Sequence, residues 1–240
     1  MSPGAGRGAH AGSAASSRPS AFTQVTERIG GAICDGTYPP GTVLTVEELE
    51  VVTGASRSVV REAARVLASK GLLRARKRVG LEILGEGEWS LFDAQVIRWR
   101  LDSPQRQTQL ASLHQLRIAI EPEAARLAAE NGTPEQAGEI ISAAGRLWSA
   151  GVDGEHDQFL RDDASLHRLI LRASGNPMFA QLSDVIHEAL RERTLHELTI
   201  RPISLSDVQL HVDLAGQIQR RRGNEAGATM REIIRRTQPS

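Results

Sequence analysis

The chain of 240 residues is poor in cysteine, in aromatic side chains and in long apolar runs. Because Cys34 is the single cysteine, an intramolecular disulfide and a zinc finger built on cysteines are both excluded. Aromatic residues make up 3% of the sequence, so the core must be mostly aliphatic and rich in alanine, a composition that favours helices. No segment reaches the roughly 18 apolar residues of a membrane span, and we expect no membrane partner.

The first 20 residues lack the features of a targeting segment. They contain no apolar run of the kind found in secretory signals, and they are rich in glycine, alanine, serine and proline. Such a composition buries too little apolar surface to fold. We therefore expect a disordered tail over residues 1–20 and a cytoplasmic protein.

Net charge is also absent, because 29 lysines and arginines balance 29 aspartates and glutamates. Binding to nucleic acid would therefore have to come from a local basic patch. Such a patch lies between Ser56 and Arg78, where Glu62 is the single acidic residue. Its basic residues are Arg57, Arg61, Arg65, Lys70, Arg74, Arg76, Lys77 and Arg78.

The first part of this patch has the pattern of a short helix. Ser56 is a residue type that caps helix N-termini, and Gly71 is a typical stop signal. Arg57, Arg61 and Arg65 are spaced by four, so they share one face of the helix. A short helix with a basic stripe fits a DNA major groove and the flanking phosphates, and a solvated charged surface is the alternative.

The surrounding residues favour a winged helix-turn-helix over residues 21–84. A helix is expected over residues 21–34, and Thr45 and Glu48 form a capping box that opens a second helix ending near Val52. A tight turn over residues 53–55 then leads into the basic helix, which is the helix-turn-helix signature. After Gly71, alternating apolar and basic residues predict two strands joined by a turn at Val79-Gly80, a basic wing.

The rest of the chain predicts an all-α domain. Residues 85–89 are expected to be a flexible acidic linker, and helical periodicity continues over residues 90–237 with breaks at glycine, proline and asparagine. No glycine loop for binding a nucleotide is present. Helices are expected near residues 91–101, 106–130, 134–150, 154–173, 177–200, 205–221 and 224–237. The fold class is thus mostly α, with a small β-wing at the front and a helical bundle behind it.

Two pairs in the predicted bundle carry chemistry. Asp163 and His167 are four residues apart, so both side chains point to one place, where they could bind a divalent metal or simply pair with each other. Arg117 and Glu121 have the same spacing in an apolar helix. The arginine is either paired with Glu121 or directed at an anionic ligand.

The N-terminal domain resembles the DNA-binding domain of GntR-type transcription regulators. The matching motifs are Gly36-x-Tyr38-x-Pro40-Gly41, Ser56-Arg57-Ser58-x-Val60-Arg61-Glu62-Ala63 and Gly71-Leu72-Leu73. The resemblance implies that Arg57 and Arg61 contact an operator and that Gly80 is a wing-tip glycine in the minor groove. Taken together, the predicted DNA-binding residues are Arg57, Ser58, Arg61, Arg65, Arg76, Arg78 and Gly80. Lys70 is expected to contact phosphate or be solvated.

One position departs from the GntR pattern. Where the family usually has an arginine that touches DNA, at the start of the second helix of the helix-turn-helix, this chain has Glu47. A carboxylate there would repel phosphate. We therefore expect an altered site preference or a weaker contact from that helix.

Residues 90–237 resemble the FCD effector domain of the FadR subfamily. The matching motifs are Leu116-Arg117-x-x-x-Glu121-Pro122, Asp163-x-x-x-His167, Ala173-Ser174-Gly175-Asn176-Pro177 and the late His211. The resemblance implies a divalent metal (Zn, Ni or Mn) held by Asp163, His167 and His211. The family's fourth ligand position is occupied by Ile233, which cannot bind a metal.

Two alternatives therefore remain for the effector site. Either three protein ligands hold a metal and a carboxylate effector completes its shell, or Arg117, His167 and His211 bind the anion without metal. The predicted effector-binding residues are Arg117, Glu121, Asp163, His167 and His211. A further likeness to galactonate-responsive repressors, through Trp89-x-x-x-Asp93-x-x-Val96-x-x-Trp99, suggests galactonate or gluconate.

The expected function is a ligand-responsive DNA-binding regulator. We expect a homodimer on a pseudo-palindromic operator, and a repressor that its effector releases from DNA. A metal-dependent enzyme is one rival, but no role for a basic winged helix follows from it. A DNA-binding protein indifferent to sequence is the other. The chain is not expected to be an enzyme.

Overall fold

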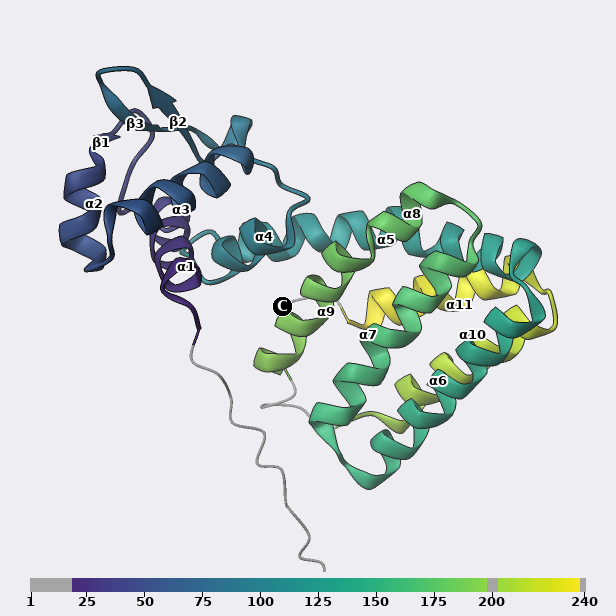
Figure 1. Ribbon diagram of the computed structural model, residues 1–240. Coiled ribbons are helices and arrows are strands. Elements are labelled where there is room, and N and C mark those ends of the chain that lie inside the picture. Colours follow the sequence, from purple (N-terminus) through teal and green to yellow (C-terminus); the bar gives the residue numbers. More distant parts are fainter. Residues whose placement is uncertain (1–18, 198–202, 238–240) are drawn as a thin grey trace, which may run out of the picture.

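The computed structural model describes residues 19–197 and 203–237. The tail predicted over residues 1–20 lies almost wholly outside these ranges. Within them the chain is mostly helical, with a winged helix-turn-helix at the front and a helical bundle behind it, and the predicted fold class is confirmed (Figure 1). None of the helices in the described ranges combines the length and apolar character that crossing a bilayer requires.

The elements follow one another in this order. They are α1 (Ala21–Cys34), β1 (Val43–Leu44), α2 (Val46–Thr53), α3 (Arg57–Ser69), β2 (Leu73–Arg76), β3 (Gly80–Ile83), η1 (Glu86–Glu88), α4 (Ala94–Leu101), α5 (Arg106–Asn131), α6 (Pro134–Asp153), α7 (His156–Ala173), α8 (Pro177–Gln181), α9 (Ser183–Glu197), α10 (Leu205–Gln219) and α11 (Gly223–Arg236).

The helix-turn-helix is set by its capping residues. The Thr45 hydroxyl accepts from the Glu48 amide and the Glu48 side chain accepts from the Thr45 amide, so the predicted capping box opens α2. Gly54 ends α2 with φ at 68°, a backbone angle that favours glycine. The expectation for Ser56 is corrected: it occupies the N-cap of α3 but makes no capping bond, and its hydroxyl lies 3.1 Å from that of Ser58.

The wing differs from its predicted form in two ways. It is a three-stranded antiparallel sheet in the order β1-β3-β2, and the two-residue strand β1 was not predicted. The turn lies at residues 77–79 rather than at Val79-Gly80, because Arg76 pairs with Gly80 in the ladder. Arg78 is therefore not on strand β2 but in the turn, with φ at 62°. Gly80 starts β3, where a Cβ would lie 2.7 Å from the Leu44 carbonyl oxygen.

The bundle is built from α5, α6, α7, α9, α10 and α11 around an aliphatic core rich in alanine. Helix α5 packs along α11, and α6 lies between α7 and α10 (Figure 1). The helix predicted over residues 177–200 is in fact two helices, α8 and α9, separated at Leu182, and its last residues lie outside the described ranges. The helix predicted from residue 91 begins at Ala94, because Asp93 caps it with two bonds to backbone amides.

The segment between the domains, for which the sequence predicted a flexible linker, has regular structure. Residues 86–88 form η1, and the Glu88 carbonyl lies so close to Gly71 that a Cβ there would meet it at 2.0 Å. The Lys70 ammonium group lies 2.6 Å from Asp93. The expectation that Lys70 contacts phosphate or is solvated is therefore corrected, because its charge is paired within the protein. Helix α4 then joins the two halves of the molecule (Figure 1).

Trp99 fixes α4 to the winged helix. The residue is 4% exposed, and its ring fills the space beside Gly30, where a Cβ would lie 2.4 Å from the ring. The indole N–H donates to Glu27 at 2.5 Å, and Gln95 donates to the same carboxylate at 2.7 Å. The DNA-binding half and α4 therefore share one core.

We predict that Trp99→Ala destabilises the DNA-binding half by about 3–5 kcal/mol, the usual cost of deleting a buried tryptophan. The measurement is urea unfolding of the full chain, monitored by circular dichroism. Trp148→Ala is the matched control, because Trp148 is 37% exposed, and it should cost far less. Equal losses for the two variants would contradict the role given to Trp99.

Candidate DNA-binding surface and buried ligand site

Helix α3 has a buried apolar face and an exposed basic face. Its core residues are Val60, Ala63, Ala64 and Leu67, each 6% exposed or less. The arginines spaced by four are exposed on the outside, as the sequence predicted. Ser58 is also exposed in the first turn of α3. The helix is thus anchored through its apolar face and presents its arginines to a partner.

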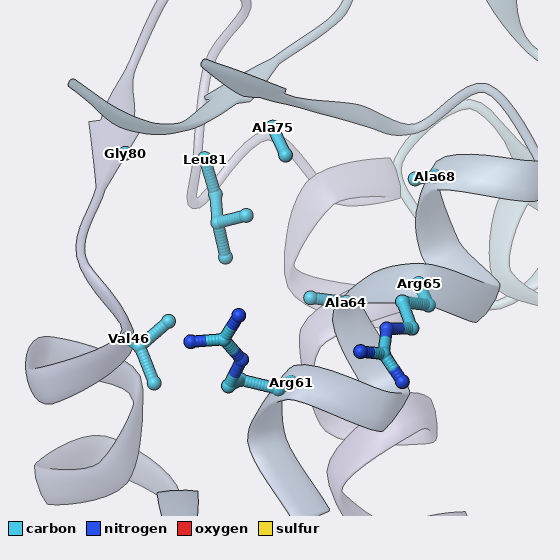
Figure 2. A pocket seen from close by; sticks show the side chains of 8 residues that line it. All are labelled: Val46, Arg61, Ala64, Arg65, Ala68, Ala75, Gly80 and Leu81. Carbon is cyan, nitrogen blue, oxygen red and sulfur yellow. The ribbon is translucent and has the colours of Figure 1, made fainter. Parts of the chain in front are cut away.

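A hollow of about 270 Å³ lies between α3 and the wing (Figure 2). Small side chains of α3 and the wing leave this space open, because alanines line it where larger residues would fill it. Arg61 and Arg65 lie along its edge, and Figure 2 shows the Arg61 guanidinium between Val46 and Leu81 while that of Arg65 points elsewhere. Two arginines therefore flank a groove next to α3, which is the second helix of the helix-turn-helix and so its recognition helix.

Arg57 is paired with the residue that departs from the family pattern. Its Nη1 lies 2.5 Å from Oε1 of Glu47, and the two side chains are 57% and 61% exposed. The pKa of Glu47 is lowered first by a backbone N–H in the first turn of α2 and then by Arg57. The sequence predicted only repulsion of phosphate by Glu47 and did not predict this pair.

The wing arginines are partly neutralised. Arg74 and Arg76 lie 2.9 Å and 3.5 Å from the same carboxylate, that of Glu82 on β3, and Arg74 is the main charged partner that lowers its pKa. Arg78 stands exposed in the turn at the tip. The basic patch read from the sequence is therefore less positive in the structure than its arginine count suggests.

Five of the predicted site residues meet inside the bundle. Arg117 and Glu121 come from α5, Asp163 and His167 from α7, and His211 from α10. All five are buried, with exposures of 4% or less. The spacing of four places each pair on one face of its helix, and the packing of α5, α7 and α10 brings the faces together.

These side chains form one chain of contacts. Arg117 Nε donates to Glu121 Oε1 at 2.6 Å, and the other Glu121 oxygen contacts His167 Nδ1. His211 Nδ1 donates to the Asp207 carbonyl at 2.7 Å. With both Nδ1 atoms engaged, both Nε2 atoms face Asp163 Oδ1, at 3.5 Å from His167 and 3.1 Å from His211.

Opposite charges control the ionisation of this cluster. Burial by itself would raise the pKa of Glu121, but Arg117 and His167 outweigh it and lower the pKa to about 2. Burial would lower the pKa of His167, but Glu121 and Asp163 outweigh it and raise the pKa to about 9. For Asp163 the effect of burial is likewise overcome by His167 and His211, so its pKa is lowered.

The donor set fits a divalent metal. Ligand atoms of Asp163, His167 and His211 all lie within 4.8 Å of one another. Among the described residues, the Nε2 atoms of both histidines and Nη2 of Arg117 are buried without a hydrogen-bond partner. A carboxylate oxygen and two imidazole nitrogens are ligands that zinc and similar ions accept, with Nδ1 bonds of the histidines orienting the rings. Ile233, where the resemblance places the family's fourth ligand, is 2% exposed in the apolar core.

A winged helix with exposed arginines, joined through α4 to a bundle that encloses a buried acid–histidine–arginine cluster, defines a ligand-responsive DNA-binding transcription regulator. Comparison with known proteins agrees. Residues 22–83 match the bacterial regulatory proteins of the gntR family, and residues 112–236 match the FCD domain. The chain belongs to the GntR family and carries an FCD effector domain, as the motifs in its sequence suggested.

Individual relatives support this assignment. The galactonate operon transcriptional repressor of Escherichia coli K12 is 31% identical over 170 residues, 69% of this chain and 73% of the repressor. The uncharacterized HTH-type regulator YieP of the same strain is 28% identical over 164 residues, 68% of this chain and 71% of YieP. The solved structure of Lar from Listeria monocytogenes superposes with a TM-score of 0.58 at 12% identity, over 92% of this chain and 96% of Lar, and shows the shared fold.

The buried charges make stability depend on pH. The raised pKa of His167, about 9 against 6.5, stabilises the fold below pH 6.5, and this contribution is lost as pH rises through 9. The lowered pKa of Glu121, about 2 against 4.5, stabilises it above pH 4.5, and this contribution is lost as pH falls through 2. We predict that the metal-free protein loses roughly 3 kcal/mol of unfolding free energy between pH 6.5 and 9, at about 1.36 kcal/mol per pKa unit.

The measurement is urea unfolding in EDTA across this pH range. His167→Gln should flatten the profile above pH 6.5. His156→Gln should keep it, because His156 is exposed and bonds locally to Gly154. A wild-type profile without a decline towards pH 9 would disprove the charge assignment of His167.

Proposed function

We propose that the protein is a transcriptional repressor that a small carboxylate, of the galactonate or gluconate type, releases from its operator. The observation that carries this proposal is a set of three buried nitrogens that make no hydrogen bond, on Arg117, His167 and His211, with both histidine nitrogens facing Asp163. Buried polar atoms are almost always satisfied in folded proteins, so such a group is a place for a ligand. The name of the galactonate operon repressor supports the sugar-acid class.

Charge balance favours a monoanionic effector. In the metal-free state the charges of Arg117, His167, Glu121 and Asp163 sum to zero, with both carboxylates ionised and His167 protonated. Metal binding requires neutral histidines, so a divalent ion in place of the His167 proton leaves the cluster with a net charge of +1. One carboxylate restores neutrality, and burial of an unbalanced charge is costly.

The residues of the cluster take separate roles in this proposal. Asp163, His167 and His211 would hold a divalent ion such as Zn, Ni or Mn, which supplies a Lewis-acidic binding point for the carboxylate. Arg117 offers its free Nη2 to the same anion. Glu121 orients Arg117 and His167 through its two oxygens. Binding of the anion without metal is the alternative that the experiment below distinguishes.

On DNA, the recognition helix and the wing would act together. Arg57, Ser58 and Arg61 lie near the N-terminal half of α3, the part that meets base edges in helix-turn-helix proteins. Arg65, Arg76 and Arg78 would contact phosphates, with Arg78 at the wing tip. Gly80 would allow the wing to approach the duplex, although it stands behind the tip. We propose a homodimer on a pseudo-palindrome, acting in the cytoplasm.

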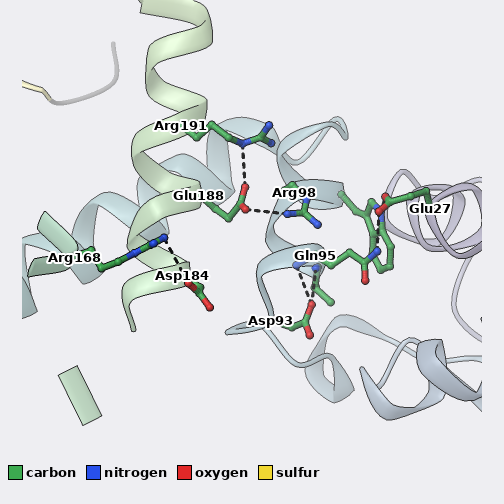
Figure 3. A network of polar contacts seen from close by, with 10 residues as sticks. Glu27, Asp93, Gln95, Arg98, Arg168, Asp184, Glu188 and Arg191 are labelled. Carbon is green, nitrogen blue, oxygen red and sulfur yellow. Dashed lines mark hydrogen bonds and ion pairs between the residues drawn. The ribbon is translucent and has the colours of Figure 1, made fainter. Parts of the chain in front are cut away.

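The path from the effector site to the DNA-binding half would run through α9 and α4 (Figure 3). Helix α7, which carries Asp163 and His167, packs on α9. Glu188 of α9 lies between Arg98 of α4 at 3.0 Å and Arg191 at 3.2 Å. Because α4 is fixed to α1 through Trp99, a shift of α9 would reach the winged helix.

The first experiment is a thermal-shift screen of galactonate and gluconate with and without EDTA. A ligand at 100 times its Kd stabilises the protein by about 2.7 kcal/mol, so a rise in melting temperature is expected. EDTA should abolish the rise if metal takes part, and preserve it if the anion binds alone. Arg117→Gln should lose the rise, and Arg161→Gln, an exposed arginine on α7, should keep it. The absence of any shift with sugar acids would refute this effector class.

The second experiment tests the path. In Arg98→Ala, the ratio of DNA affinities without and with effector should fall towards 1, from the roughly 5- to 150-fold typical of coupled sites. The effector's own thermal shift should persist, because Arg98 lies outside the cluster. Arg172→Ala, an exposed arginine on α7, is the control. An undiminished ratio in Arg98→Ala would show that coupling takes another route.

A further inference from the structure

The starting point is the ion pair between α2 and α3. The N-terminal end of α2 is fixed by the Thr45–Glu48 capping box, and Glu47 follows Thr45 by two residues. Leu49 is 1% exposed and Val60 0%, so the two helices are held against one another by their cores. The Glu47 carboxylate is therefore delivered by a rigid scaffold to Arg57, at 2.5 Å from its Nη1.

This pair changes what Arg57 can do. An unrestrained arginine at a helix end samples many rotamers, whereas one bonded to a carboxylate through Nη1 samples fewer of them. One bond to Glu47 uses a single N–H of the five that arginine carries. The others are free to donate, and two donors in one plane are what guanine O6 and N7 accept in the major groove. Adenine offers a donor where guanine offers O6, so it does not match.

We propose that Glu47 is a specificity-determining residue that orients Arg57 to read guanine in the operator. The proposal rests on the DNA-binding function given above and adds to it the residue that selects the base. The same carboxylate, exposed beside the duplex, repels phosphates and so weakens binding to DNA of any other sequence. Glu47 thus lowers the affinity for DNA in general and raises the discrimination between guanine and other bases.

The first test is selection of duplexes from a randomised DNA library by the full-length protein. The base pair whose enrichment falls most in Arg57→Ala is the one that Arg57 reads, and we expect it to be G·C. Binding is then measured by fluorescence anisotropy on the selected duplex and on the same duplex with that pair replaced by A·T. Wild type should prefer G·C by about 5- to 150-fold, the range for a bidentate contact.

Glu47→Ala should reduce this preference to a few-fold while binding the A·T duplex as tightly as wild type or more tightly. Glu62→Gln removes one carboxylate from the exposed side of α3 and should keep the preference. In the Arg57→Ala background, Glu47→Ala should leave the remaining preference unchanged, because Glu47 acts through Arg57. Circular dichroism melting confirms that each variant is folded.

Two results would overturn the proposal. One is an undiminished G·C preference in Glu47→Ala, and the other is an equal effect of Glu47→Ala with and without Arg57. If wild type enriches no sequence at all, the operator-reading function fails together with the proposal. The first two results leave that function intact, because wild type still selects a site.

Discussion

The structure depends on one constraint, which is that charges buried between helices must be paired. Arg117, Glu121, Asp163 and His167 sit where water does not reach, and each finds an opposite charge on its own helix or on the facing one. Compared with apolar residues of similar volume, a buried ion pair adds little stability, whereas a buried charge that loses its partner is costly. The pairs are therefore a strong constraint, because a slip of α5 against α7 would leave a charge unpaired. The register of the bundle and the position of the ligand site are set by the same contacts.

The same rule applies at the surface with a different result. The winged helix has many arginines, yet Glu47 and Glu82 neutralise part of the patch. Exposed pairs of this kind add little to the stability of the fold. A patch that is partly neutral in the free protein gives up non-specific attraction, which depends on total charge, and leaves more of the recognition to geometry. The net charge of zero for the whole chain agrees with this picture.

Local patterns predicted a large part of this architecture. The ends of α1, α3 and α5, the Thr45 capping box and the four-residue spacings of the ligand cluster follow from neighbours within one or two helical turns, and sequence shows these directly. The buried cluster also needed a resemblance to bring in His211, which lies 44 positions after His167. Periodicity cannot supply such a distance, because tertiary packing decides it.

What the sequence did not predict has the same physical cause. Strand β1 has two residues, too few to show alternation, and exists because β3 offers an edge. The pairs Lys70–Asp93 and Arg98–Glu188 join residues 23 and 90 positions apart. The Glu47–Arg57 pair could have been predicted from the sequence, because the two opposite charges lie on neighbouring helices that a tight turn brings together. In each case the partner lies on another element, and only the packing of the two elements brings the residues together.

Helix α4 also has a consequence for how such regulators exchange parts. One side of it holds Trp99 against Gly30 of α1, and the other holds Arg100, whose guanidinium binds both Glu86 and Gln109. A chimera joined within residues 85–89 would separate α1 from its own α4. The winged helix would lose the tryptophan that packs beside Gly30, and Trp99 would be left without that contact on the bundle. The interchangeable module is therefore the winged helix together with α4. A foreign bundle would have to present surfaces equivalent to those of α5 and α9 before it could be grafted on.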